Sequence, residues 1–402
     1  MLVLPVAEQI SQQVAYILSK FTIMYNFVAF NPVKLHFGKN VVKDLGPAAA
    51  TLGKKALLVY GGGSVLRNGS YNDTLDQLKG KGIAVTEYNG IKPNPRVEDV
   101  MEAARLGRDA DVDMVLAVGG GSVIDSAKII AICIAENCDA WELMTGKYIP
   151  RAAKPLIAVL TLAATGTEMN AVAVLQNGET MEKIGFRNEL EYPAHSFLDP
   201  TYTQSVPADY TAYGIVDLVA HSLEAWFGRG EATLSDRIVI SVIKEAMEFG
   251  PALMKDLENY QLRANIMWAA TMALNNTTIY GRESGDWGVH ALGHVLSFLY
   301  DTPHGATLSI IYPAWMNVMK DRTGDRITQL GSELFGVSTA DETIDALKAF
   351  FRALGSPVKC QEAGIEETRK DEILKLMNRN RAQGMNHRLS DEEREKVLSS
   401  MF

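Results

Sequence analysis

Hydrophobic positions follow two different patterns along the chain, and the change from one to the other comes near residue 207. Before that point, strands are predicted at residues 56–60, which form an apolar run of the buried-strand type, and at residues 84–88, 114–118 and 155–162. Stretches with a helical pattern lie between or after them, at residues 71–79, 97–108 and 123–135. Strands that alternate with helices predict a parallel sheet with right-handed crossovers and a binding site at the carboxyl ends of its strands.

The second part of the chain carries mainly the 3.6-residue period of helices. Helices are expected over residues 208–227, 231–248, 260–276, 286–299, 307–320 and 340–354. A last short helix should begin behind Ser390, because Ser390 and Glu393 have the spacing of a capping box. We therefore predict an α/β domain over residues 24–206 and an all-α domain over residues 207–402. No Ser/Gly-rich linker separates them, so we expect the two domains to pack closely around a cleft.

The first 37 residues stand outside both patterns. Residues 1–23 lack the basic start and the cleavage site of a secretory signal, and we treat them as an extension of unknown role before Met24. Residues 27–37 alternate in polarity, are rich in strand-forming residues and contain the turn Asn31-Pro32. This pattern predicts an N-terminal hairpin or an edge strand.

Composition and charge narrow the functional classes. The 402 residues suffice for two domains with separate cores, and 47% hydrophobic with 22% charged residues is typical of a globular protein. No apolar run is long enough to span a bilayer, so no membrane partner is expected. The net charge of −9 argues against nucleic acid as the main partner. Three cysteines without a CxxC pair favour a reducing cytoplasmic location.

Four of the seven histidines fall in one stretch of the second domain. Asp217 and His221 are four residues apart in an apolar stretch, and His290 and His294 repeat that spacing, so each pair should share a helix face. One such pair alone is more typical of a solvated or hydrogen-bonded helix surface. Two pairs followed by His304, all in apolar surroundings, favour a divalent metal, because these polar groups are costly to bury without a partner. One carboxylate with three imidazoles suits zinc or ferrous iron.

Two Gly-Gly-Gly-Ser sequences, at residues 61–64 and 119–122, each follow a predicted strand and precede a predicted helix. Glycine lets the backbone approach a phosphate, and the amides and dipole of the next helix favour its negative charge. One such loop is equally typical of a tight turn. Two in one sheet, with Asp125 and Lys128 after the second, favour a dinucleotide, although neither loop is G-x-G-x-x-G or a P-loop. Residues 161–168 add hydroxyl groups after the fourth strand, which is also typical of a polar cap on the next element.

Six short sequences together resemble the iron-containing (group III) alcohol dehydrogenases over roughly residues 25–400. They are G-G-G-S-V-I-D-S-A-K (119–128), T-L-A-A-T-G-T-E-M-N (161–170), L-D-P (198–200), G-I-V-D-L-V-A-H (214–221), H-A-L-G-H (290–294) and H-G-A-T (304–307). Y-G-G-G-S-V (60–65) and R-A-N-I-M-W-A-A-T (263–271) are similar to the butanol-dehydrogenase-like branch of NADPH-dependent aldehyde reductases. The resemblance implies a dehydroquinate synthase-like fold, with an N-terminal Rossmann-like parallel-sheet domain for the cofactor and a C-terminal helical metal-binding domain.

The resemblance also implies a role for each site residue. One Fe²⁺ or Zn²⁺ ion per chain would be held by Asp217, His221, His290 and His304. His294 would lie near the substrate as a proton-relay or positioning group. The implied cofactor contacts are Gly120, Gly121 and Ser122 at the pyrophosphate, Thr161 and Thr165 on the adenosine side, and Lys183 at the nicotinamide ribose.

The reaction that the resemblance implies is hydride transfer between NAD(P)H and a small aliphatic aldehyde or primary alcohol, such as butyraldehyde or butanol. The metal would stabilise the oxygen on which negative charge develops. The resemblance further suggests a homodimer, in which residues 27–37 pair with their counterpart in the second copy.

Cofactor choice is predicted from the first glycine loop. Enzymes that favour NAD place a carboxylate near the 2′-hydroxyl of the adenosine ribose, and the family that the chain resembles has an Asp just after the matching strand. Here that position falls in Gly61-Gly62-Gly63-Ser64, where there is no acid, and Arg67 follows. Small residues leave room for a 2′-phosphate, which the backbone amides, Ser64 and Arg67 can bind. We therefore predict that NADP(H) is preferred over NAD(H).

Two alternative functions stay open from the sequence. The first is an NAD-dependent metal lyase of the dehydroquinate synthase type, which normally has Glu as the carboxylate ligand and additional basic residues for an anionic substrate. Asp217 and the few basic residues in 214–227 count against it. The second is a non-catalytic metal- or nucleotide-binding protein, against which the intact set of ligands counts.

Overall fold

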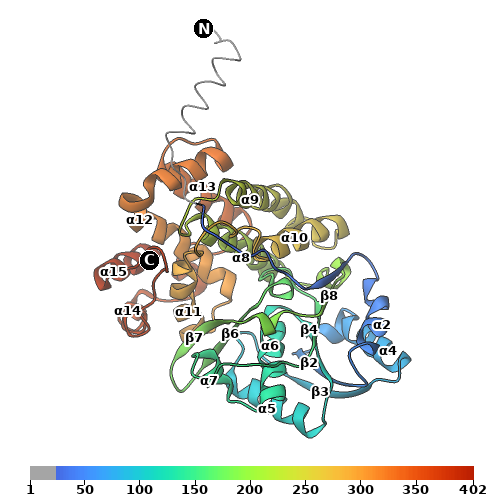
Figure 1. Cartoon of the computed structure of the whole chain (residues 1–402). Helices are drawn as coiled ribbons and strands as arrows, with labels where there is room; N and C mark the ends of the chain where they lie inside the picture. The colour runs from blue at the N-terminus through green and yellow to red at the C-terminus, as the bar shows by residue number, and fades with distance from the viewer. Residues whose placement is uncertain (1–23) are drawn as a thin grey trace.

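The computed structural model describes residues 24–402, and the predicted extension over residues 1–23 lies outside the described residues. Figure 1 shows two parts, a sheet with flanking helices in the lower half and a cluster of helices above it. This is the α/β plus all-α architecture that the hydrophobic pattern predicts. The predicted domain boundary falls between the 3-10 helix η4 (Pro200–Thr203) and the helix α8 (Ala208–Trp226).

Six parallel strands form the sheet, in the order β1-β8-β5-β4-β2-β3. They are β1 (Lys34–Phe37), β2 (Lys55–Gly61), β3 (Ala84–Ile91), β4 (Met114–Gly119), β5 (Leu156–Leu160) and β8 (His195–Leu198). The four predicted strands are all present, and the parallel sheet is confirmed. The short strand β8 has no counterpart among the predicted strands, because four residues are too few to show a distinct period.

Helices cover both faces of the sheet. In this part of the chain they are α2 (Leu45–Ala50), α3 (Ser64–Arg67), α4 (Ser70–Gly80), α5 (Val97–Asp109), α6 (Gly121–Glu136) and α7 (Ala140–Met144), with the 3-10 helices η1 (Val41–Asp44), η2 (Thr167–Met169) and η3 (Glu189–Glu191). Leu57 of β2 lies in a buried cluster with residues of α5 and α6, whereas Leu58 lies in a second cluster with residues of α2 and α4. Because both of their faces are buried, β2, β4 and β5 are nearly continuous apolar runs rather than alternating ones.

An antiparallel hairpin, absent from the sequence prediction, joins the two parts of the molecule. Its strands are β6 (Val172–Asn177) and β7 (Glu182–Arg187), and β7 packs against helix α11 of the helical part. The signal was present, because Asn177-Gly178 is a turn pair between two alternating segments. The hairpin matters for function because β7 carries Lys183.

The helical part surrounds the buried helix α8. Its other helices are α9 (Thr233–Leu253), α10 (Tyr260–Ala273), α11 (Gly288–Tyr300), α12 (His304–Phe335), α13 (Ala340–Ala353), α14 (Lys370–Arg379) and α15 (Asp391–Met401), with the 3-10 helices η5 (Gln361–Ala363) and η6 (Glu367–Arg369). The capping box of Ser390 and Glu393 is confirmed. Differences from the prediction include the helix α14 and the bounds of α12, which runs from His304 to Phe335 with a kink at Thr323, rather than from residue 307 to 320.

The N-terminal segment forms an edge strand and no hairpin. Only residues 34–37 of the predicted region are a strand, and they pair in parallel with β8. The preceding residues lie along the helical part, where the amide of Tyr25 donates to the carbonyl of Gly281 (2.9 Å) and the ring of Phe27 stacks on Tyr280 at 5.1 Å. Figure 1 shows this segment crossing from the helical part to the edge of the sheet.

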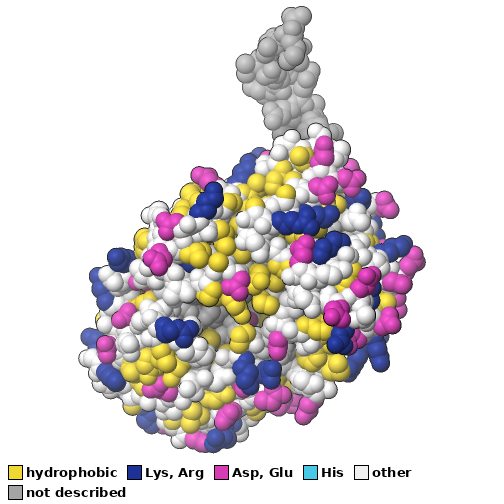
Figure 2. Space-filling view, turned by 180° about the vertical axis from the view of Figure 1, so that it is seen from behind, with side chains coloured by type: hydrophobic (Ala, Val, Ile, Leu, Met, Phe, Trp, Pro, Cys, Tyr) yellow, Lys and Arg dark blue, Asp and Glu magenta, His cyan; other side chains and the backbone are white. Residues whose placement is uncertain are grey.

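The surface carries charges of both signs. On the face shown in Figure 2, basic and acidic side chains are interspersed, and neither sign covers a continuous area. Within residues 24–402, no helix combines the length and the apolar composition needed to cross a bilayer.

Candidate metal centre and cofactor cleft

Asp217 and three histidines converge on one point in the helical part. The Nε2 atoms of His221, His290 and His304 lie 3.7, 3.9 and 3.6 Å from Oδ1 of Asp217. Asp217, His290 and His304 each offer a ligand atom within 4.8 Å of the other two. The side chain of Asp217 is only 3% exposed, and even the most accessible of the three imidazoles, that of His304, is 25% exposed. The structure therefore gathers around Asp217 the three histidines that the resemblance implies as metal ligands, with His221 outside the set of three that lie within 4.8 Å of one another.

Several polar atoms of this group are buried without a hydrogen-bond partner, among them Oδ1 of Asp217 and Nε2 of His290. Each such atom costs about 1–3 kcal/mol of stability unless something satisfies it. In a tetrahedral site with metal–ligand bonds of about 2.1 Å, the ligand atoms are about 3.4 Å apart. The separations between Asp217 and the three imidazoles, 3.6–3.9 Å, are close to that value, and this carboxylate with its imidazoles fits a divalent metal ion.

The helices place these ligands. Asp217 and His221 lie one turn apart on α8, and both are buried, so this pair is not a solvated helix surface. His290 is in the first turn of α11, and His304 is the first residue of α12. The helices α8, α11 and α12 therefore each contribute proposed ligands to the same site.

Burial and the neighbouring carboxylates together determine the protonation of these imidazoles. Desolvation lowers the pKa of His221 to about 4 and the pKa of His304 well below its usual value. Desolvation also lowers the pKa of His290, but the carboxylates of Asp217 and Glu224 outweigh it and raise that pKa to about 9. At neutral pH, His221 and His304 are thus uncharged, which is the form that binds a metal.

Glu224 is a site residue that the sequence reasoning missed. It is 1% exposed, and its Oε1 lies 2.7 Å from Nδ1 of His290. The signal was its spacing on α8, seven residues after Asp217 and three after His221, which puts all three on one helical face. The prediction had stopped at the ligands themselves.

His294 lies beside the Asp217 group rather than in it. Its Nδ1 is 3.0 Å from the backbone oxygen of Lys183, and its ring centroid is 5.6 Å from that of His304. Because a carbonyl oxygen only accepts hydrogen bonds, Nδ1 carries the hydrogen and Nε2 is left as an acceptor. Desolvation lowers the pKa of His294 well below its usual value, and the charge of Lys183 acts in the same direction.

Lys183 is buried between the two parts of the molecule. Its residue exposure is 9%, and its Nζ donates to Oδ1 of Asn94 in the loop after β3 (2.8 Å). Desolvation lowers the pKa of Lys183 to about 8, although Asp125, Asp217 and Asp301 oppose the shift. A lysine buried at this cost is not an ordinary surface residue.

The second glycine loop meets the 161–165 loop at the carboxyl edge of the sheet. Thr161 donates its amide to the carbonyl of Gly119 (3.0 Å), and a Cβ on Gly121 would come within 2.7 Å of the Thr165 side chain. Only glycine allows this close approach. Since α6 begins at Gly121, its N-terminal amides are at the same edge, together with Gly120 and Ser122.

Asp125 lies deeper in α6 and is already hydrogen-bonded within the protein. Its two carboxylate oxygens accept from Oγ1 of Thr167 (2.6 Å) and from the amide of Val174 (2.9 Å). The Nζ of Lys128 donates to the same Thr167 hydroxyl (2.7 Å) and to the carbonyl of Val172 (2.7 Å). These contacts anchor the β6–β7 hairpin on α6, and cofactor binding by Asp125 stays a prediction.

The first glycine loop lies at the same edge, after β2. Gly63 has a left-handed backbone (φ +61°), whereas a Cβ on Gly62 would meet nothing within 4 Å. A Cβ on Gly63 would be 3.3 Å from Nη1 of Arg67, so the guanidinium folds back toward the loop. The loop thus combines open space with a nearby positive charge.

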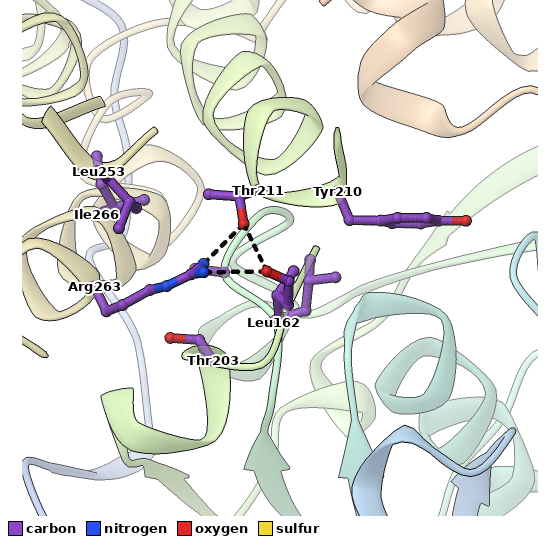
Figure 3. A pocket seen from close by; sticks show the side chains of 9 residues that line it. Leu162, Thr203, Tyr210, Thr211, Leu253, Arg263 and Ile266 are labelled. Carbon is purple, nitrogen blue, oxygen red and sulfur yellow. Dashed lines mark hydrogen bonds between the residues drawn. The ribbon is translucent and has the colours of Figure 1, made fainter. Parts of the chain in front are cut away.

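A small pocket adjoins the 161–165 loop (Figure 3). Leu162 and Ala163 line it together with the buried Arg263 of α10, whose Nη1 donates to Oγ1 of Thr211 (2.9 Å) and whose Nη2 donates to the carbonyl of Val206 (3.2 Å). The central space is only about 10 Å³, which is room for one water molecule. Arg263 therefore acts here as a cross-link between α10 and the start of α8.

Comparison with known proteins places the chain in one family along nearly its whole length. Residues 32–200 match the family described as "Iron-containing alcohol dehydrogenase", and residues 211–401 match "Fe-containing alcohol dehydrogenase family, C-terminal". A probable NADH-dependent butanol dehydrogenase 1 from Bacillus subtilis is 41% identical over 359 residues, which are 87% of this chain and 92% of the relative. The NADPH-dependent aldehyde reductase YqhD from Escherichia coli is 37% identical over 364 residues, 88% of this chain and 93% of the relative.

The same kinship holds among solved structures. The crystal structure of an NADH-dependent butanol dehydrogenase A from Thermotoga maritima has a TM-score of 0.90 to this chain at 36% identity, and the match covers 94% of this chain and 99% of that one. Together with the convergence of Asp217 and three histidines, these likenesses settle the kinship: the chain belongs to the iron-containing alcohol dehydrogenase family.

Proposed function

We propose that this protein transfers a hydride between NADPH and a small aliphatic aldehyde or primary alcohol, such as butyraldehyde or butanol, at a metal centre in the helical part. Members of its family are alcohol dehydrogenases and aldehyde reductases that use a nicotinamide cofactor, and this protein is an oxidoreductase of that kind. The observation that carries the proposal is that three imidazole nitrogens each lie within 3.9 Å of one carboxylate oxygen of Asp217 in a buried site.

We assign the four metal ligands to Asp217, His221, His290 and His304, which suit Fe²⁺ or Zn²⁺ equally. A bound ion would act as a Lewis acid on the carbonyl oxygen of the aldehyde. The burial of Asp217 supports this assignment, because a charge buried without an ion or hydrogen bonds would be costly.

His294 and Lys183 are proposed to handle the proton and the cofactor ribose. The hydrogen bond from Nδ1 of His294 to the Lys183 carbonyl leaves Nε2 free to accept or pass on a proton. The Nζ of Lys183 has one observed partner, Asn94, and retains donors for a ribose hydroxyl. The contact between these two residues would hold the proton relay and the ribose at a fixed separation.

The cofactor is proposed to lie along the carboxyl edge of the sheet, over Gly120, Gly121, Ser122, Thr161 and Thr165, with Asp125 supporting this region. We further propose that residues 24–206 are the cofactor domain and residues 207–402 the metal and substrate domain.

NADPH is proposed as the preferred cofactor, because the loop of Gly62, Gly63 and Ser64 has no carboxylate and Arg67 is folded toward it. The relatives are divided on this point, since they include both NADH- and NADPH-dependent enzymes.

A homodimer is proposed from the N-terminal edge of the sheet. Among the described strands, β1 pairs with β8 on one side only. Large apolar side chains are exposed along the segment before and within β1, namely Met24, Phe27, Val28, Phe30 and Phe37. Trp268 of α10 packs edge-on against Phe37 (5.9 Å) and borders a groove of about 600 Å³ between α9 and α10. A second copy is the proposed occupant, because an edge strand and an apolar patch can pair with their own counterparts about a twofold axis.

A cytoplasmic location is also proposed. It is supported by the three cysteines, which are buried and free.

A steady-state assay of the metal-loaded protein tests the proposed function. The protein would be stripped of metal, reloaded with Zn²⁺ or Fe²⁺, and given short aliphatic aldehydes with NADPH or NADH. We expect aldehyde-dependent oxidation of the cofactor only in the loaded protein. If stoichiometric metal is bound and no short aldehyde or alcohol reacts with either cofactor, the proposed function is wrong.

A further inference from the structure

Glu224 accepts three hydrogen bonds from the start of α11, beside the proposed metal centre. Its Oε1 accepts hydrogen bonds from the backbone amide of His290 (3.2 Å) and from Nδ1 of the same residue (2.7 Å). Its Oε2 accepts from the backbone amide of Trp287 (2.5 Å). All three donors belong to the start of α11, whereas Glu224 belongs to α8.

The contact with Nδ1 determines which nitrogen of His290 is available for a metal. A carboxylate accepts and does not donate, so Nδ1 must carry the hydrogen. The lone pair of the neutral ring is then on Nε2, and Nε2 is the atom that lies 3.9 Å from Oδ1 of Asp217 without any hydrogen-bond partner. The orientation of the ring therefore matches metal binding through Nε2.

The two backbone contacts fix the position of the same helix end. Trp287 precedes α11 in a left-handed conformation (φ +64°), which is unusual for a bulky residue. Its ring lies 5.5 Å from that of His290 and 6.4 Å from that of His221. Because Glu224 accepts from the amides at positions 287 and 290, it holds this turn against α8, which carries Asp217 and His221.

The nearby acid Asp286 does not perform this task. Its Oδ1 accepts from the amides of Asn386 (3.0 Å) and His387 (2.6 Å), and its Oδ2 accepts from the amide of Gly288 (3.3 Å). The contacts with Asn386 and His387 anchor the segment before α15, and the contact with Gly288 stays within the turn that begins α11. Among the described residues, Glu224 is the carboxylate whose oxygen is bonded to the outer nitrogen of an imidazole of the metal group.

We propose that Glu224 is a positioning residue of the metal centre. It orients His290 so that Nε2 binds the ion, and it locks the start of α11 onto α8 so that the four ligands stay at bonding separations. A carboxylate on the outer nitrogen of a metal-bound histidine also increases the basicity of the ring. This inference rests on the proposed metal centre, although Glu224 itself does not touch the ion.

Replacing Glu224 by Gln removes the negative charge and part of the hydrogen bonding, while the volume of the side chain is nearly unchanged. The side chain of Gln has one oxygen acceptor where Glu has two. Its amide nitrogen would therefore lie against one of the N–H groups that Glu224 binds, and the hydrogen bond to that group would be lost. We expect the Glu224→Gln protein to bind Zn²⁺ about 10–100-fold more weakly than the wild type, measured by competition with a chromophoric chelator. We also expect the visible absorption spectrum of the Co²⁺-loaded variant to differ from that of Co²⁺-loaded wild type, since the position of His290 changes.

A control for burial alone is Glu191→Gln in the sheet part. Glu191 is also 1% exposed and lies in η3, away from α8 and α11 in the chain, and neither of its carboxylate oxygens accepts a hydrogen bond. We expect this variant to keep the Zn²⁺ affinity and the Co²⁺ spectrum of the wild type. A similar loss of affinity in both variants would overturn the inference, because it would show a general effect of altering a buried acid.

The outcomes distinguish this inference from the proposed function. If the wild-type protein binds neither Zn²⁺ nor Co²⁺, the metal centre and the proposed function fail together. If the wild type binds metal and the natively folded Glu224→Gln protein binds it equally tightly with the same Co²⁺ spectrum, only the role of Glu224 is refuted.

If the variant does not fold, ¹⁵N NMR of the Zn²⁺-loaded wild type decides instead. The inference requires that Nδ1 of His290 carries a slowly exchanging hydrogen and that Nε2 binds the ion. Binding of the ion through Nδ1 would overturn it.

Discussion

Lys183→Met should stabilise the protein while it weakens cofactor binding. Lys183 is 9% exposed, and desolvation lowers its pKa from 10.5 to about 8. A shift of that size means that the folded state disfavours the charged side chain by about 3.4 kcal/mol, since one pKa unit is about 1.36 kcal/mol. Methionine has a similar length and no charge, so it removes this cost. It also removes the hydrogen bond to Asn94 and leaves a buried oxygen with one donor fewer, which costs about 1–3 kcal/mol.

The pH dependence separates these two contributions. Below about pH 8, Lys183 is charged in both states and the full penalty applies; above about pH 10.5 it is neutral in both, and the penalty is gone. The unfolded state binds more protons between these values, so the wild type gains stability relative to the variant as the pH rises. From the two pKa values, the penalty is about 3.3 kcal/mol at pH 7 and about 1.4 kcal/mol at pH 9.5. The lost hydrogen bond contributes equally at both pH values.

Urea unfolding of the two cofactor-free proteins at pH 7 and at pH 9.5 measures this change. We expect the free energy of unfolding of Lys183→Met, minus that of the wild type, to fall by about 2 kcal/mol between pH 7 and pH 9.5. Exposed Lys147 provides the control, because Lys147→Met should change little at either pH. A difference between Lys183→Met and wild type that is constant within about 0.5 kcal/mol would refute the idea that this lysine is buried with its charge. The KM for NADPH should rise in Lys183→Met but not in Lys147→Met.

Three further predictions follow from the proposed site. His290→Ala should remove most of the bound metal and lower activity more than about 100-fold, whereas His294→Ala should keep the metal and lower kcat about 10²–10⁴-fold. Stoichiometric metal in the double variant His290→Ala/His304→Ala, measured by elemental analysis, would contradict the ligand assignment. Position 62 has open space and an ordinary φ, so the Gly62→Asp protein should fold. It should lower the NADPH-to-NADH ratio of kcat/KM about 10–100-fold, or about 1.4–2.7 kcal/mol. A wild type that prefers NADH would show that the loop does not select the 2′-phosphate. Deletion of residues 1–23 should leave the dimer intact and deletion of residues 1–38 should break it, as judged by light scattering, and a monomeric wild type at micromolar concentration would disprove the proposed interface.

Local features of the sequence determined much of this protein. The apolar runs predict β2, β4 and β5 because a strand covered on both faces needs apolar residues at nearly every position, whereas the edge strand β3 is partly exposed. The four-residue spacing of Asp217 and His221 predicts a shared helical face whatever surrounds the helix. The capping box at Ser390 is equally local, since its two partners are three residues apart. Such features depend only on near neighbours in the chain, so they can be found without the fold.

The tertiary structure alone decided which distant segments meet. Lys183 gives no signal of its own in the sequence, but the β6–β7 hairpin brings its carbonyl to His294, 111 residues away, and buries its side chain. Glu224 lies on the predicted face of α8, yet only the packing of α11 brings it to His290, 66 residues further along. The strand β1 is paired with β8, although 159 residues separate His36 from His195 in the neighbouring strand. A hydrophobic pattern records how much of a side chain is buried and not which partner buries it, so partners of this kind emerge only when the chain is folded.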